Sequence, residues 1–161
     1  MAAETISSGS AAGSAIQVSV YDAMPSVGRK FLLAGKGGLN LTHAEKFEPF
    51  ASRYGQAAVN LKPMLTSFGP QQLRDWASVL GVATFVGSSG RVFPADMKAA
   101  PLLRAWLHRL RAMGVRFFMR HRWLGWGDDG CLMFDTPTGQ ISVQADAVVL
   151  ALGGEIGRAH V

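Results

Sequence analysis

The sequence contains a single cysteine and no long apolar run. These two scarcities argue against a disulfide-linked fold and against a membrane-spanning helix. Cys131 alone cannot form an intrachain disulfide, which fits a reduced, cytoplasmic setting. No apolar stretch reaches the roughly 18 residues that a membrane-spanning helix needs. The first residues, MAAETISSGS, lack the positive and apolar regions of a secretory signal. We therefore expect a cytoplasmic protein with no membrane segment.

Residues for metal binding or nucleophilic catalysis are also scarce. The histidines, His43, His108, His121 and His160, are scattered and lack the spacing of paired metal ligands. There is no evident Ser-His-acid set, and Cys131 is expected to pack as a small apolar side chain. The sequence predicts no metal site and leaves the catalytic residues unassigned.

Apolar residues and positive charge, by contrast, are plentiful. The chain has 161 residues, 48% of them hydrophobic, which is enough for one domain with a core. Its net charge of +5, with a pI near 9.9, favours anionic partners. The charge alone does not distinguish a nucleic-acid partner from a phosphate-bearing cofactor, or either of them from a positive charge that arose by chance.

Local patterns predict alternating helices and strands. The alternating, β-branched stretch IQVSVYD predicts a strand that ends at Tyr21 or Asp22. We expect a short N-terminal helix, a glycine-rich loop over 28–43, two helices within 61–82 broken at Gly69-Pro70, a hairpin over 83–94, a helix over 97–114, and strands over 115–126, 131–137, 140–145 and 146–154.

The end of the first strand and the loop after it carry the main chemical signal. An acidic strand end such as Asp22 binds a ribose hydroxyl in dinucleotide-binding folds, although it is also common in solvated turns. The partner motif, G-x-G-x-x-G, is absent, since Gly9 and Gly13 have the wrong spacing and position. This part of the sequence leaves both interpretations open.

Residues 28–43, GRKFLLAGKGGLNLTH, do not fit a P-loop. Six residues separate Gly28 from Gly35, and Gly37 follows Lys36, so the Walker spacing fails. Asn40-Leu41-Thr42 matches the N-glycosylation motif, and we interpret this match as a coincidence. Two interpretations remain: backbone N–H groups and cations that face a phosphate or an electron-rich ring, and an ordinary surface loop.

Three ordered segments resemble one family. They are VYDAMPSVGRKFLLAGKGGLNLTH, GRVFPADMKAAPLLRAWLHRL and DAVVLALGG. Together they are similar to the BaiN/HI0933-like flavoproteins, also known as aminoacetone-oxidase-like, which are bacterial NAD(P)/FAD-dependent oxidoreductases. The resemblance implies a three-layer α/β, Rossmann-like FAD-binding domain of the glutathione-reductase type.

The resemblance also implies roles for individual residues. Asp22 would bind the adenosine ribose, and Lys30 of the G-R-K motif would approach the pyrophosphate or the flavin. Asn40 and Thr42 would hydrogen-bond flavin or ribityl oxygens, and Trp123 would lie beside the adenine unless it is a core aromatic. The full set of implied cofactor-binding residues is Asp22, Arg29, Lys30, Gly35, Lys36, Gly37, Gly38, Asn40, Thr42, Trp123, Gly153 and Gly154.

The two ends of the chain depart from the family pattern. In the family, the first strand and the glycine fingerprint precede a helix that resembles MAAE, so we expect both to be missing here, together with a C-terminal part. The peptide IGRAHV is also the translation of one reading frame of a common sequencing adapter. We therefore expect residues 155–161 to be a non-native tail. On this interpretation the chain is an inactive fragment that does not retain FAD.

A basic, aromatic segment provides an alternative from another class of protein. Between Asp96 and Asp128 there is no acidic residue, and tryptophan and phenylalanine alternate with lysine and arginine. This composition is typical of a non-catalytic nucleic-acid-binding module, and equally of a solvated helix face above a core. We expect no nucleic-acid partner and keep that module as the alternative.

The combined prediction divides the chain into four parts. Residues 1–46 would form a partial FAD-binding βαβ segment, 47–113 an inserted α/β segment, 114–154 a strand, a meander and the return strand, and 155–161 the tail. The parent enzyme would pass hydride equivalents from NAD(P)H through FAD to an organic small-molecule acceptor.

Overall fold

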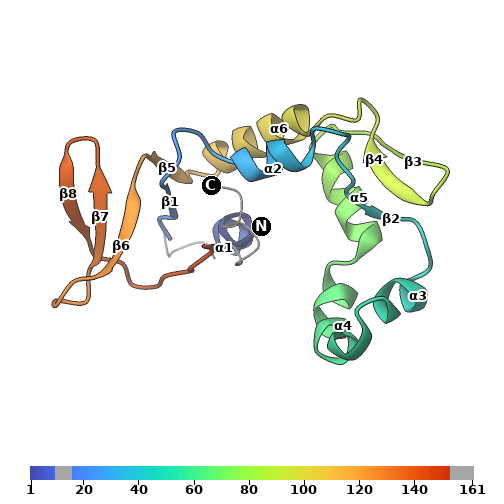
Figure 1. Ribbon diagram of the computed structural model, residues 1–161, viewed down its shortest axis with the longest axis horizontal. Coiled ribbons are helices and arrows are strands. Elements are labelled where there is room, and N and C mark those ends of the chain that lie inside the picture. The colour runs from blue at the N-terminus through green and yellow to red at the C-terminus, as the bar shows by residue number, and fades with distance from the viewer. Residues whose placement is uncertain (10–15, 153–161) are drawn as a thin grey trace. The chain divides into compact units, whose positions relative to one another are not determined.

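The computed structural model of the chain describes residues 1–9 and 16–152 (Figure 1). It contains both helices and strands. The chain folds into two compact units: unit 1 comprises Met1–Val20 and Ser26–Phe117, and unit 2 comprises Tyr21–Pro25 and Phe118–Val161. Each unit is described separately below.

The elements of unit 1 are mostly helical. They are α1 (Ala2–Ser8), α2 (Arg29–Ala34), β2 (Thr42–His43), α3 (Phe47–Ser52), the 3-10 helix η1 (Gly55–Ala57), α4 (Ala58–Ser67), α5 (Pro70–Val79), β3 (Thr84–Val86), β4 (Arg91–Pro94) and α6 (Ala99–Ala112). Strands β2, β4 and β3 form an antiparallel sheet in that order.

The core of unit 1 lies where α5 and α6 meet the loop before β2. Ala77 and Leu102 are fully buried, and Leu39 and Ala99 join them. The helix predicted over 97–114 is confirmed as α6, and its apolar spacing buries Leu103 and Leu110 on one face. The helix break predicted at Gly69-Pro70 is confirmed as well, since α4 ends at Ser67 and α5 begins at Pro70.

Strands β1 (Ser19–Asp22) and β5 (Arg116–Met119) pair with each other, and each begins in unit 1 and ends in unit 2. In unit 1, Arg116 N–H donates to the Val18 carbonyl at 3.0 Å. In unit 2, His121 N–H donates to the Asp22 carbonyl at 3.0 Å. Donor and acceptor numbers rise together, so the pair is parallel, as expected for an α/β fold.

Unit 2 contains an antiparallel meander of β6 (Arg122–Trp126), β7 (Leu132–Thr136) and β8 (Gly139–Val143) (Figure 1). The ring of Tyr21 stacks on Phe118, with centroids 4.8 Å apart, and on Phe134, at 4.5 Å. This aromatic cluster attaches the short segment Tyr21–Pro25 to the meander.

Several features differ from the sequence prediction. Helix α2 occupies the first part of the predicted loop, and α3 was not predicted. The strand predicted over 115–126 is broken at Arg120, which adopts φ 58° and separates β5 from β6. No strand forms over residues 144–152, where the side chains of Val149 and Leu150 are 64% and 51% exposed.

The described residues contain neither a membrane-spanning helix nor a metal-binding cluster. None of the helices in residues 1–9 and 16–152 combines the length and apolar character that crossing a bilayer requires. Within the same residues, no three histidine, cysteine or acidic side chains gather in a way that could hold a metal ion.

Candidate functional site

The first half of the candidate loop is the helix α2, which lies against α6 (Figure 1). Glycines at the two ends of α2 allow this approach. A Cβ atom on Gly28, whose φ is 75°, would lie 2.8 Å from Leu103, and one on Gly35 would lie 2.5 Å from the Ala99 Cβ. Gly28 and Gly35 are seven residues apart and therefore lie on one helix face. The structure thus gives Gly35 a packing role.

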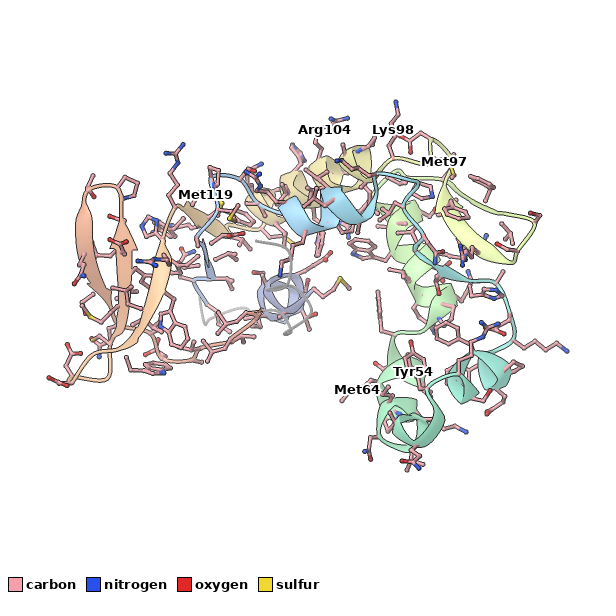
Figure 2. The ribbon with its side chains drawn as sticks, in the orientation of Figure 1. Tyr54, Met64, Met97, Lys98, Arg104 and Met119 are labelled. Atoms are coloured by element: carbon pink, nitrogen blue, oxygen red, sulfur yellow. The ribbon has the colours of Figure 1, made fainter. Side chains whose placement is uncertain are left out.

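The turn after α2 is built from backbone contacts. Gly38 adopts φ 109°, and a Cβ on it would meet the end of the Met97 side chain at 2.6 Å. Leu39 N–H donates to the Met97 carbonyl at 2.9 Å, and Met97 itself has φ 62° (Figure 2). A Cβ on Gly37 would meet no atom within 4 Å. Gly37 is therefore the glycine of this turn with open space beside it.

The loop ends in a hydrogen-bonded strand. The side-chain NH2 group of Asn40 donates to the carbonyls of Thr42 at 2.9 Å and Val92 at 3.2 Å. Leu41 N–H donates to the same Val92 carbonyl at 2.8 Å, and Thr42 pairs with Val92 across β2 and β4. Asn40 thus fixes the backbone around Thr42, while its side-chain oxygen is not needed for these bonds.

Three cations lie in this part of the chain. Arg29 and Lys30 lie on α2 and Lys36 follows it, and all three side chains are exposed. None of them forms an ion pair within the described residues, whereas Arg53 and Lys62 pair with glutamates. The loop therefore presents positive charge that no described carboxylate neutralises.

Asp22 lies in unit 2, at the carboxyl end of β1. Its Oδ1 accepts a hydrogen bond from Met24 N–H at 2.9 Å, which forms an Asx turn. No other hydrogen bond to this carboxylate occurs in the part of the chain that the structure describes. Its second oxygen is therefore available to another donor.

Trp123 also lies in unit 2, on β6. It is half-buried and makes an edge contact with Trp126, with ring centroids 6.1 Å apart. Its Nε1 is buried and has no acceptor among the described residues. The predicted site residues Gly153 and Gly154, and the predicted tail 155–161, lie outside the described residues.

Several cations of the basic segment between Asp96 and Asp128 form contacts within the protein. In unit 1, Arg109 forms an ion pair with Glu4 at 2.9 Å, and Arg111 lies over the Phe117 ring. In unit 2, Arg122 pairs with Asp135 at 3.3 Å. Lys98, the N-cap residue of α6, and Arg104, on α6, are by contrast exposed (Figure 2). The segment is thus not a continuous row of free cations.

Glu4 is a residue whose importance the sequence did not reveal. Its carboxylate accepts hydrogen bonds from Trp76 Nε1 at 3.1 Å, Trp106 Nε1 at 2.8 Å and Arg109 Nη1 at 2.9 Å. Burial raises the pKa of Glu4, but the hydrogen bonds from Arg109, Trp76 and Trp106 outweigh it, so the pKa lies below its usual value. These contacts join α1 to α5 and α6.

The chain matches a known protein family. The family model described as the HI0933-like protein Rossmann domain matches residues 1–157, which cover all three segments that carry the resemblance. The search of curated proteins found no match.

Proposed function

Because the chain belongs to the HI0933-like family, which is in general a family of FAD-binding Rossmann-domain oxidoreductases, we propose that its loop and Asp22 serve to bind FAD. We further propose that the enzyme transfers hydride equivalents from NAD(P)H through FAD to an organic acceptor. The observation that carries the proposal is Asp22, an acidic side chain at the carboxyl end of a parallel strand. Ligands of open α/β sheets bind at that end of the strands.

The hydrogen bonds of Asp22 support a role with ribose. One carboxylate oxygen holds the turn through Met24 N–H, which fixes the side chain in one orientation. The other oxygen accepts no hydrogen bond within the described residues. We propose that it accepts from a ribose hydroxyl of the adenosine half. A fixed acceptor loses little side-chain entropy on binding, which favours affinity.

The charge distribution supports an anionic ligand for unit 1. Every Lys and Arg before residue 153 lies in unit 1 except Arg120 and Arg122. The FAD pyrophosphate carries negative charge, which the exposed Arg29, Lys30 and Lys36 would attract. Gly37 would let the cofactor approach the backbone, since open space lies where its Cβ would be.

The polar end of the loop supplies the remaining contacts. Asn40 holds its own backbone with its NH2 group, and we propose that its oxygen and the Thr42 hydroxyl face ribityl or flavin groups. The buried Trp123 Nε1 lacks an acceptor, and a cofactor oxygen or nitrogen would supply one. A bound flavin would supply the hydride chemistry, and the residues named above would hold and orient it.

Flavin binding tests the proposal. The protein is expressed from the full open reading frame that encodes this chain, and FAD affinity is measured by quenching of flavin fluorescence. Asp22→Asn and the double variant Lys30→Gln/Lys36→Gln should each weaken binding about 10- to 100-fold, since each loses charge-assisted contacts of about 1.5–3 kcal/mol. Lys62→Gln, whose lysine pairs with Glu48 on the surface, is the matched control.

Two results would contradict the proposal. One is a purified protein that neither carries nor binds FAD. The other is an affinity for FAD that the loop and Asp22 substitutions leave at the level of the Lys62→Gln control.

A further inference from the structure

Met97, in the turn between β4 and α6, has a backbone conformation that favours glycine (Figure 2). Its φ is 62°, in the left-handed region that glycine adopts freely and that asparagine and aspartate tolerate. A residue with a long side chain costs free energy at such a position. A strained residue that is kept in a fold points to a use for its side chain.

The backbone of this turn is held by hydrogen bonds that do not involve the Met97 side chain. Met97 N–H donates to the Pro94 carbonyl at 2.9 Å, and Lys98 N–H donates to Asp96 Oδ1 at 3.1 Å. The Met97 carbonyl accepts from Leu39 N–H at 2.9 Å. These bonds impose the same φ on whichever residue stands at position 97.

The Met97 side chain lies over Gly38. A Cβ on Gly38 would be 2.6 Å from Met97 Cε and 3.9 Å from Met97 Sδ, with the edge of the Phe93 ring at 3.8 Å. Gly38 itself has φ 109°, a conformation that residues with side chains rarely adopt. Because Gly38 has no side chain to limit its rotation, Met97 and Phe93 limit it from outside.

Gly38 is the last residue of the turn that carries the exposed part of the loop. Gly38 N–H donates to the Gly35 carbonyl at 3.2 Å, which closes a turn with Lys36 and Gly37 at its centre. Lys36 is exposed, and a Cβ on Gly37 would meet no atom within 4 Å. Gly35 is fixed by its packing on α6. One end of the turn is therefore held by α6 and the other by Met97.

We propose that Met97 is a positioning residue of the loop, whose side chain restricts Gly38 and so keeps Lys36 and Gly37 in one orientation before a ligand binds. A turn that is ordered in advance loses less conformational entropy on binding, which favours affinity. The unbranched, flexible methionine side chain suits an irregular space of this kind. The link to FAD rests on the function proposed above, whereas the ordering of the turn does not.

The exposure of Met97 separates this role from that of a core residue. Met97 is 37% exposed, whereas Leu102 on the following helix is fully buried. Removing the Met97 side chain therefore loses only part of the free energy that burying a whole methionine would supply. A replacement that suits a φ of 62° recovers backbone free energy at the same time. Stability and flavin affinity should consequently respond differently to substitution, which a purely structural residue would not show.

Two variants that differ by one methylene group test the proposal. Met97→Asn suits the left-handed conformation but is too short to cover Gly38, whereas Met97→Gln has nearly the length of methionine and no preference for that conformation. Both are made in the protein expressed from the full open reading frame. The asparagine variant should unfold at the same urea concentration as the glutamine variant or at a higher one. Its FAD dissociation constant should nevertheless rise about 5- to 20-fold, against less than about 2-fold for Met97→Gln, because binding must then order a freed backbone.

Nuclear magnetic resonance on the flavin-free, glycine-labelled proteins tests the ordering of the turn directly. The amide order parameters of Gly37 and Gly38 should be near 0.85, roughly that of rigid backbone, in the unaltered protein and in Met97→Gln, and should fall to about 0.6 in Met97→Asn. Met64→Asn, which alters a methionine on α4 that is 67% exposed, is the control and should leave both amides unchanged. Equal order at Gly38 in Met97→Asn and in the unaltered protein would overturn the proposal.

The two measurements distinguish a failure of the positioning role from a failure of the proposed function. A protein that binds no FAD contradicts the proposed function, and the order parameters then decide the role of Met97 alone. A dissociation constant that rises equally in Met97→Asn and Met97→Gln, or that changes only as the urea midpoint changes, contradicts the positioning role. If Met97→Asn does not fold, Met97→Gly replaces it, because glycine suits the same φ and also leaves Gly38 uncovered.

Discussion

Gly35 lies so close to Ala99 that a Cβ atom on it would approach the Ala99 methyl carbon to 2.5 Å. The contact fixes the distance between α2 and α6 and therefore the position of the exposed cations on α2. We predict that Gly35→Ala lowers the free energy of unfolding by about 1–3 kcal/mol, the usual cost of overpacking. Urea denaturation measures it, with Gly37→Ala as control, because a Cβ there meets no atom within 4 Å. Equal effects of the two substitutions would refute the packing role.

Glu4 should contribute strongly to the stability of unit 1. Glu4→Gln leaves Arg109 half-buried without its counter-charge, and we predict a loss of about 2–3 kcal/mol. The emission of Trp76 and Trp106 should shift as well, since both indoles bond to this carboxylate. Glu48→Gln, which breaks an exposed pair with Lys62, should cost less than about 1 kcal/mol. Similar losses in the two variants would contradict the prediction.

The same carboxylate should make stability depend on pH in acid. The folded-state pKa of Glu4 lies below its unfolded value, because hydrogen bonds from Arg109, Trp76 and Trp106 outweigh burial. Its contribution is therefore complete above the unfolded pKa and is lost as pH falls through the folded pKa. Urea unfolding below about pH 5 should show a steeper loss in the unaltered protein than in Glu4→Gln. Parallel curves would argue against this assignment.

We predict that the protein does not bind nucleic acid. Arg109 and Arg122 are engaged in ion pairs, and Trp106 donates to Glu4, so the basic segment has fewer free groups than its sequence indicates. Filter binding with single- and double-stranded DNA at low salt should show no retention. Retention that falls steeply with salt would overturn this prediction, because phosphate contacts release counterions.

The sequence predicted those features that depend on near neighbours. Gly69-Pro70 marks a helix break, and the apolar spacing of α6 marks a buried face, so both were found. Helix α2 was not predicted, because its flanking glycines indicated a loop while RKFLLA contains good helix formers. Residues 146–152 have strand-forming composition, but a strand needs hydrogen-bonded neighbours, and sequence cannot say whether they are there.

Contacts between residues far apart in the sequence explain why some features of the structure were not predicted. Glu4 meets Trp76 and Arg109 only through the fold, so no spacing rule reveals it. Family membership was recognised from three ordered segments and is confirmed by the family match over residues 1–157. The roles of Asp22 and of the loop residues stay predictions, as do the four domain boundaries.

The stacking of Tyr21 between Phe118 and Phe134 has a practical consequence for dissecting this molecule. Unit 2 takes that ring from the N-terminal part of the chain and its strands from the C-terminal part, so no single excision yields it intact. A peptide beginning at Phe118 would present two bare aromatic faces to water and would be prone to self-association. Supplying residues 21–25 through a circular permutation that joins them to the meander would be the sound way to isolate it.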